Sequence, residues 1–132
     1  MTTELWLLVA AVLLGFVQIV LQAQSMNMQR GYRWNAGPRD EVFPPLTGVA
    51  GRLNRALRNF LETFPFFAAA VLIANSANIH NSLTLWGAWL YVVGRIGYLP
   101  LYAFGVSNVR SLVWNVAVLG IFMILSGIAR GA

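Results

Sequence analysis

The chain has 132 residues, of which 58% are hydrophobic and only 10% are charged. A typical soluble domain is about 25% charged, so the composition excludes an ordinary soluble protein. The net charge of +5 comes from arginine, without any lysine, and the arginines lie between long apolar runs rather than on the polar, basic surface typical of nucleic-acid-binding proteins. We interpret the chain as a membrane protein of one domain, residues 1–132, that contacts lipids and no nucleic acid.

Four apolar segments approach the roughly 20 residues that a helix needs to cross a bilayer. They predict helices at about 5–28, 50–75, 82–103 and 110–129. The first lacks the positive start of a cleavable signal peptide, so we expect it to span the membrane. The connection from 29 to 49 is rich in Gly, Pro and Asn and is expected to be a loop. The other two connections are short, which favours antiparallel neighbours. The predicted fold class is an all-α membrane protein, a four-transmembrane-helix antiparallel bundle.

The arginines also predict a topology. Most of them surround the first connection, and Arg110 lies at the third, whereas the second connection carries no charge and only His80. The positive-inside rule then places the first and third connections in the cytoplasm and both termini outside. Because His80 is alone and the chain has no cysteine, no metal site is predicted, and His80 is interpreted as a solvated loop residue.

The second helix begins with an unusual concentration of charge, in GRLNRALRNFLETFPF at residues 51–66. At helical spacing, five polar side chains share about one third of its circumference: Arg52, Arg55, Arg58, Asn59 and Glu62. Ionisable groups at membrane depth cost roughly 2.5 kcal/mol or more, so they usually face a protein interior or a wet cavity. In the alternative interpretation, Arg58 and Glu62 neutralise each other, and the earlier arginines extend to lipid phosphates.

The third and fourth helices carry more polar groups on the same predicted cytoplasmic side: Arg95, Tyr98, Tyr102, Arg110 and Ser111. A guanidinium and a hydroxyl at a helix start suit an anion or a thiolate. The alternatives are that the tyrosines anchor the chain at the membrane interface and that Arg110 only fixes topology. In this set of side chains, the arginines can bind carboxylates, the glutamate can bind an ammonium group, and the asparagine can bind a peptide group. We therefore expect a small, multiply charged ligand.

Three segments resemble a known family. RALRNFLETFPFF and VGRIGYLPLYAFGVSNVRSLVW are similar to motifs of the MAPEG family, the membrane-associated proteins in eicosanoid and glutathione metabolism, and WNAGPRDE resembles bacterial members. The resemblance covers nearly the whole chain and points to the microsomal glutathione transferase and prostaglandin E synthase branches. It implies a homotrimer in the bacterial inner membrane, with periplasmic termini, that binds glutathione as co-substrate at the subunit interfaces.

The resemblance also implies roles for individual residues. The glutathione-binding set would comprise Arg30, Arg58, Asn59, Glu62, Arg95, Tyr98, Tyr102 and Arg110, and the catalytic set would be Arg110, which stabilises the thiolate, with Ser111 as a hydrogen-bond donor. The chain has Tyr98 where prostaglandin synthases of the family have a histidine, and Trp114 where some members have a tyrosine. The first departure argues against prostaglandin synthase activity, and the second implies that one glutathione contact of the family is absent.

The function expected from the sequence is a detoxifying glutathione S-transferase, with glutathione peroxidase activity as a second reaction. It would attack a small lipophilic electrophile or a hydroperoxide from the bilayer. The alternative is a non-enzymatic protein of the same family that binds and presents lipids. A third interpretation, a channel or carrier, is disfavoured because AAAVLIA and VLGIFMIL, deeper in the second and fourth helices, carry no polar residue. In a fourth interpretation, the polar side chains form a structural cluster that only holds the trimer together.

Overall fold

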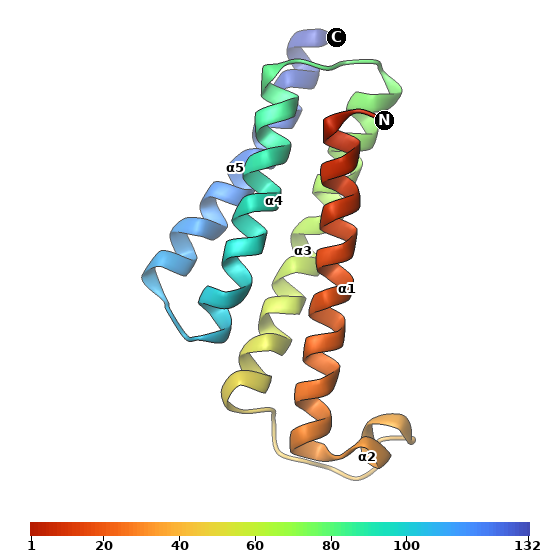
Figure 1. The fold of residues 1–132 in the computed structure, drawn as a ribbon, viewed down its shortest axis with the longest axis vertical. Coiled ribbons are helices and arrows are strands. Elements are labelled where there is room, and N and C mark those ends of the chain that lie inside the picture. Colours follow the sequence, from red (N-terminus) through yellow and green to blue (C-terminus); the bar gives the residue numbers. More distant parts are fainter.

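The computed structural model describes residues 1–132, which form helices and no strand. The long helices are α1 (Thr3–Arg30), α3 (Gly48–Ser76), α4 (Ser82–Ala103) and α5 (Asn108–Gly131). Both termini and the α3–α4 turn lie at one end of an elongated bundle (Figure 1). The α1–α3 connection lies at the other end, toward which the α4–α5 turn also points. We call these the terminal end and the arginine end.

A fifth helix, α2 (Tyr32–Ala36), corrects the prediction that the whole first connection is a loop. Gly31 ends α1 with a φ of 88°, a left-handed conformation that favours glycine. After this turn, Trp34 Nε1 donates to the Glu41 carbonyl at 2.7 Å, and the Arg30 guanidinium lies 4.7 Å from the Trp34 ring. These contacts stabilise a single helical turn that composition alone does not predict.

Local signals account for the helix starts at the terminal end. Thr2 caps α1, because its hydroxyl accepts from the Leu5 N–H at 3.2 Å. Asn81 caps α4 through a capping box with Thr84, in which each side chain bonds the other residue's backbone N–H. The observed helices extend past the expected boundaries by one or two residues, except α4, which begins and ends at the expected residues.

Three helices, α1, α3 and α5, are long and apolar enough to cross a membrane. The fourth long helix, α4, has 22 residues and so is about 33 Å long, enough to span. Its one charged side chain is the buried Arg95, and its other residues include several aromatic residues and glycines. A fourth span at α4 stays a prediction.

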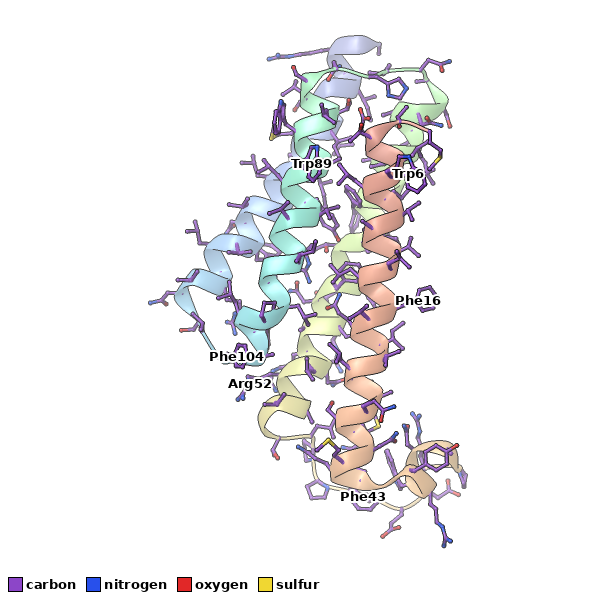
Figure 2. The ribbon with its side chains drawn as sticks, viewed as in Figure 1. Trp6, Phe16, Phe43, Arg52, Trp89 and Phe104 are labelled. Carbon is purple, nitrogen blue, oxygen red and sulfur yellow. The ribbon has the colours of Figure 1, made fainter.

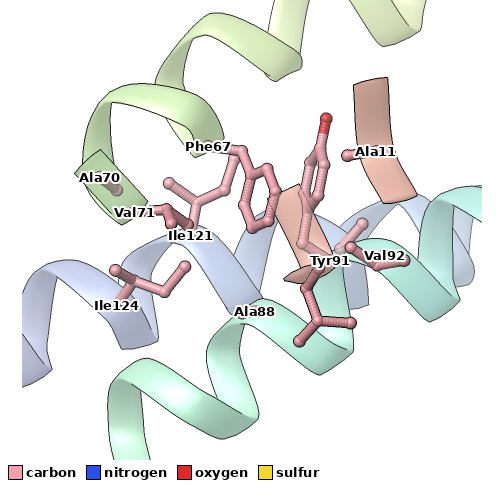
Figure 3. Packing of buried hydrophobic residues seen from close by; sticks show 11 residues of the cluster. Ala11, Phe67, Ala70, Val71, Ala88, Tyr91, Val92, Ile121 and Ile124 are labelled. Carbon is pink, nitrogen blue, oxygen red and sulfur yellow. The ribbon is translucent and has the colours of Figure 1, made fainter. Parts of the chain in front are cut away.

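The core joins all four long helices around an aromatic pair. Phe67 of α3 and Tyr91 of α4 stack with ring centroids 4.1 Å apart, and small and aliphatic side chains of α1, α3, α4 and α5 pack around them (Figure 3). The Tyr91 hydroxyl lies 2.9 Å from Thr63 Oγ1, so the buried phenol is hydrogen-bonded. Small residues and short aliphatic chains fill the remaining space.

Helices α4 and α5 approach so closely that their backbones touch. A Cβ added to Gly120 would lie 2.4 Å from the Gly87 carbonyl oxygen, and one added to Gly94 would lie 3.0 Å from Ala117 Cβ. Small residues at helix contacts are typical of membrane bundles. This packing fixes the start of α5, with Arg110, relative to the end of α4.

Large apolar side chains point outward along the bundle. Trp6, Phe16, Trp89 and Phe104 are 60%, 62%, 41% and 82% exposed (Figure 2). So much outward apolar surface suits contact with lipid tails or with other subunits rather than with water.

Candidate functional site

The polar side chains of α3, α4 and the start of α5 meet in one pocket at the arginine end. It has a volume of about 380 Å³ and is lined by Arg55, Arg58, Asn59, Glu62, Tyr98, Tyr102 and Arg110. A second pocket of about 330 Å³ shares Asn59, Tyr98 and Arg110 with the first and adds Ser111, Trp114 and Asn115. We call the two together the polar pocket. The structure thus brings together most of the side chains that the sequence singled out.

Tyr102 is the centre of the cationic side of the polar pocket. Arg55 Nε donates to the Tyr102 hydroxyl at 3.1 Å, and the Arg110 guanidinium lies 4.6 Å from the Tyr102 ring centroid. The Tyr98 and Tyr102 rings are tilted against each other, with centroids 5.5 Å apart. Tyr98 is only 4% exposed and packs inside the bundle, whereas Tyr102 is half-buried.

The charges of the polar pocket are not neutralised within the chain. The neutral pair suggested for Arg58 and Glu62 does not form, because neither side chain has an ion-pair partner, and both are exposed. Three guanidinium groups and one carboxylate line the pocket, which leaves an excess of two positive charges. Such a site attracts an anionic ligand that also carries a cationic group.

Arg95 has a different position from the other arginines. Its side chain is 1% exposed and lines neither part of the polar pocket. Its Nη1 donates to Asn59 Oδ1 at 2.7 Å, and its guanidinium lies 4.2 Å from the Tyr98 ring centroid. The resemblance implied that Arg95 helps to bind glutathione; within one chain, Arg95 contacts the pocket lining through Asn59 and Tyr98.

The start of α5 supplies hydroxyl and indole groups next to Arg110. Ser111 is exposed and donates to the Ser107 carbonyl at 3.2 Å, so its hydroxyl can still accept or exchange a hydrogen bond at the pocket. Trp114 Nε1 is buried without a partner. Asn115 Nδ2 donates to the Ser111 carbonyl at 2.9 Å.

Arg30 is not part of the polar pocket in its own chain. It lines a separate pocket of the α2 region, and its Nη2 donates to the Pro44 carbonyl at 2.9 Å. A contact between Arg30 and a ligand in the polar pocket would therefore need a second copy of the chain.

Sequence reasoning left Arg55 out of the site, as it did Trp114 and Asn115, although all three line the polar pocket. The alternative interpretation sent Arg52 and Arg55 to lipid phosphates, but Arg55 binds Tyr102, and Arg52 Nε donates to the Ala103 carbonyl at the end of α4, at 2.8 Å. The signal was present, since Arg55 precedes Asn59 by four residues on the same helix face.

An apolar groove continues from the polar pocket between α3 and α5. It has a volume of about 560 Å³ and is lined mainly by Phe66, Ala69, Ile73, Val118, Phe122 and Leu125. Glu62 belongs both to this groove and to the polar pocket, and so does Trp114. The site therefore joins a charged compartment to one that suits an apolar molecule.

The interpretation of His80 as a solvated residue was incomplete. His80 Nδ1 lies 3.7 Å from Glu4 Oε1, and the side chain is 36% exposed. The contact arises because the α3–α4 turn folds over the start of α1, which the sequence of either segment alone does not indicate.

Comparison with known proteins identifies the family. A search of curated proteins finds no match. A family model, that of the MAPEG family, matches residues 7–130 and so includes every residue of the polar pocket. This family includes glutathione transferases and related enzymes. The chain, an integral membrane protein, belongs to the MAPEG family.

Proposed function

We propose that the protein is a glutathione S-transferase of the membrane, with glutathione peroxidase activity as a second reaction. The observation that carries this proposal is the polar pocket, with its unpaired arginines and Glu62, at the end of an apolar groove. One compartment suits glutathione and the other a lipophilic electrophile.

The charges of the pocket match those of glutathione group by group. Glutathione as a thiolate has two carboxylates, one sulfur anion and one ammonium. The pocket offers three guanidinium groups, from Arg55, Arg58 and Arg110, and the Glu62 carboxylate. Guanidinium groups bind carboxylates with charge-assisted hydrogen bonds, and a carboxylate binds an ammonium in the same way. The Asn59 amide can hydrogen-bond a peptide group of glutathione.

Arg110 is the residue that we assign to the thiolate. A free thiol has a pKa near 8.5, and only the thiolate is a strong nucleophile. A guanidinium stays protonated, so beside the sulfur it favours the ionised form without competing for its proton. A shift of about 2 units in the thiol pKa corresponds to about 2.7 kcal/mol. Ser111, the next residue, can donate to the sulfur when its hydroxyl turns away from the Ser107 carbonyl.

The electrophile would enter from the lipid through the apolar groove. In conjugation to an aryl halide, the sulfur of the thiolate forms a bond to the ring carbon, and the halide leaves with the electron pair of the broken bond. In reduction of a lipid hydroperoxide, the thiolate attacks the terminal oxygen, the O–O bond breaks, and the alkoxide leaves and takes a proton from water. The sulfenic acid that forms on the sulfur then condenses with a second glutathione, which gives the disulfide and releases water.

We also propose that the protein is a homotrimer in the bacterial inner membrane. The apolar outer faces of the helices suit subunit contacts as well as lipid, and the arginine end would lie in the cytoplasm, where the positive-inside rule places it. In such an assembly Arg30 would reach glutathione from a neighbouring subunit.

The first experiment is a titration of glutathione into purified protein in detergent, followed by the ultraviolet absorbance of the thiolate. We expect a saturable thiolate signal in the natural protein. Arg110→Ala should abolish the signal, because the thiolate loses its counter-ion. The matched control is Arg130→Ala, which removes an exposed arginine of the same helix at the terminal end and should leave the signal unchanged.

The same titration separates the enzyme from the second candidate, a non-enzymatic lipid-binding protein. That candidate is favoured by the apolar groove alone. If no glutathione binds at millimolar concentration while a fluorescent fatty acid binds, the transferase proposal is wrong, and the protein presents lipids. A thiolate signal that persists in Arg110→Ala would instead contradict the role of Arg110.

A further inference from the structure

The contact between Arg95 and Asn59 determines which chemical group the polar pocket presents to a ligand. Arg95 Nη1 lies 2.7 Å from the Asn59 side-chain oxygen. A guanidinium has only donors, so the atom of Asn59 that faces it must be the acceptor, Oδ1. The Asn59 amide nitrogen is therefore turned away from Arg95.

The amide nitrogen of Asn59 remains free for a ligand. It makes no hydrogen bond within the chain, and it is not among the buried polar atoms without a partner. Asn59 lines both parts of the polar pocket and is half-buried. The group that it offers at the pocket wall is thus an N–H donor, and its natural partner is an oxygen acceptor.

The environment of Arg95 shows that it is held in place for this contact. The guanidinium lies 4.2 Å from the Tyr98 ring centroid and 5.5 Å from that of Phe60, two aromatic rings that restrict its movement. Its Nε and Nη2 have no partner, although the side chain is 1% exposed. Burial of a charge is a poor way to stabilise a fold, since apolar replacements are often neutral or better. The orientation of a neighbouring amide is something that an apolar side chain cannot supply.

We infer that Arg95 is a positioning residue that locks Asn59 with its NH2 group toward the pocket, so that the site selects a ligand with a carbonyl or carboxylate oxygen at this point. This inference rests on the proposed function, in which the oxygen belongs to the backbone of glutathione, and it replaces a direct contact of Arg95 with the ligand. Without Arg95 the amide is free to rotate and to present its oxygen, which repels the same ligand group.

Asn59→Asp tests the inference, because it has nearly the same shape but replaces the outward NH2 with an oxygen. The inner oxygen still accepts from Arg95 and gains a negative charge beside the buried cation. We expect the thermal unfolding midpoint to rise and the glutathione affinity, measured by calorimetry, to fall at least tenfold. A fall in the midpoint would contradict the contact between the inner oxygen and Arg95.

The matched control is Asn54→Asp, which adds the same charge to α3, keeps the oxygen that accepts from Gln22 and lines neither part of the polar pocket. It should lower the affinity less than threefold. If Asn59→Asp lowers the affinity no more than Asn54→Asp does, Asn59 does not donate to the ligand, and the inference is wrong.

A second pair of variants tests Arg95 itself. Arg95→Leu should raise the Michaelis constant for glutathione severalfold, and Arg95→Lys, which keeps one donor, should recover part of the loss. Equal losses in the two variants would contradict a positioning role. If the natural protein binds no glutathione at all, the proposed function fails and the ligand part of the inference fails with it. The unfolding midpoint of Asn59→Asp still tests the contact between Asn59 and Arg95, since a fall would overturn that contact.

Discussion

The two ends of the bundle both bury polar side chains, but they use them differently. At the terminal end, Glu4 of α1 is 7% exposed, accepts from Thr84 Oγ1 at 2.9 Å and lies 3.7 Å from His80. These partners come from the same chain. A buried carboxylate with its own partners is typical of a structural contact.

At the arginine end the polar groups outnumber their partners. Glu62 and Arg58 line the pocket and have no ion-pair partner. Arg95, behind them, makes one side-chain hydrogen bond although its guanidinium has five N–H donors. The comparison teaches that burial or charge alone does not mark a site. What marks it is polar side chains whose partners the chain itself does not supply.

Arg110→Ala should have the largest effect on function. Loss of about 2.7 kcal/mol of thiolate stabilisation, for a shift of about 2 pKa units, predicts a fall in kcat/KM of about 100-fold. The measurement is conjugation of glutathione to chlorodinitrobenzene. Arg130→Ala, at the terminal end, should keep the natural rate, and equal losses in both variants would show that net charge rather than position matters.

Glu62→Ala should affect binding but not stability. Removal of the partner of the glutathione ammonium is expected to weaken binding about tenfold, or about 1.4 kcal/mol. Because Glu62 is exposed and unpaired, the thermal unfolding midpoint should stay within experimental error. A drop in the midpoint would mean that Glu62, like Glu4, makes a contact that stabilises the fold.

Glu4→Ala should show the opposite pattern. It removes the acceptor of the Thr84 hydroxyl, which can still donate to the Asn81 carbonyl at 2.9 Å. We therefore expect a loss of about 1 kcal/mol in the free energy of unfolding, at the low end for a buried hydrogen bond. Thermal denaturation in detergent measures it. Glutathione affinity should be unchanged, and a weaker affinity would contradict the separation of the two ends.

Arg52→Ala should have the smallest effect. It removes the bond from Arg52 Nε to the Ala103 carbonyl, one of the free carbonyls at the end of α4. A single partly exposed hydrogen bond predicts a loss of about 0.5 kcal/mol in stability. Turnover should fall less than twofold, because Arg52 does not line the polar pocket. A larger fall in turnover would show that the bond from Arg52 to the end of α4 is needed to keep Tyr102 in its position in the polar pocket.

Much of the protein follows from the sequence because the signals are local. The four long helices follow from the apolar runs, and the membrane class follows from the composition. The caps at Thr2 and Asn81 follow from side chains next to the helix starts. The motif around Asn59 and Glu62 pointed to the family that the match over residues 7–130 now shows. Helical periodicity also placed Arg55, Arg58, Asn59 and Glu62 on one face of α3.

The sequence did not determine which of these groups pair with one another, because the pairs join residues far apart in the chain. Arg52 and Ala103 are 51 residues apart, Arg55 and Tyr102 are 47 apart, and Arg95 and Asn59 are 36 apart. Each contact depends on how α3 and α4 pack, and that packing depends on side-chain shapes along both helices. Charge and periodicity therefore showed that α3 has a polar face, whereas only the tertiary structure decided that Arg95 is buried behind it and that Arg55, Arg58 and Glu62 face the pocket.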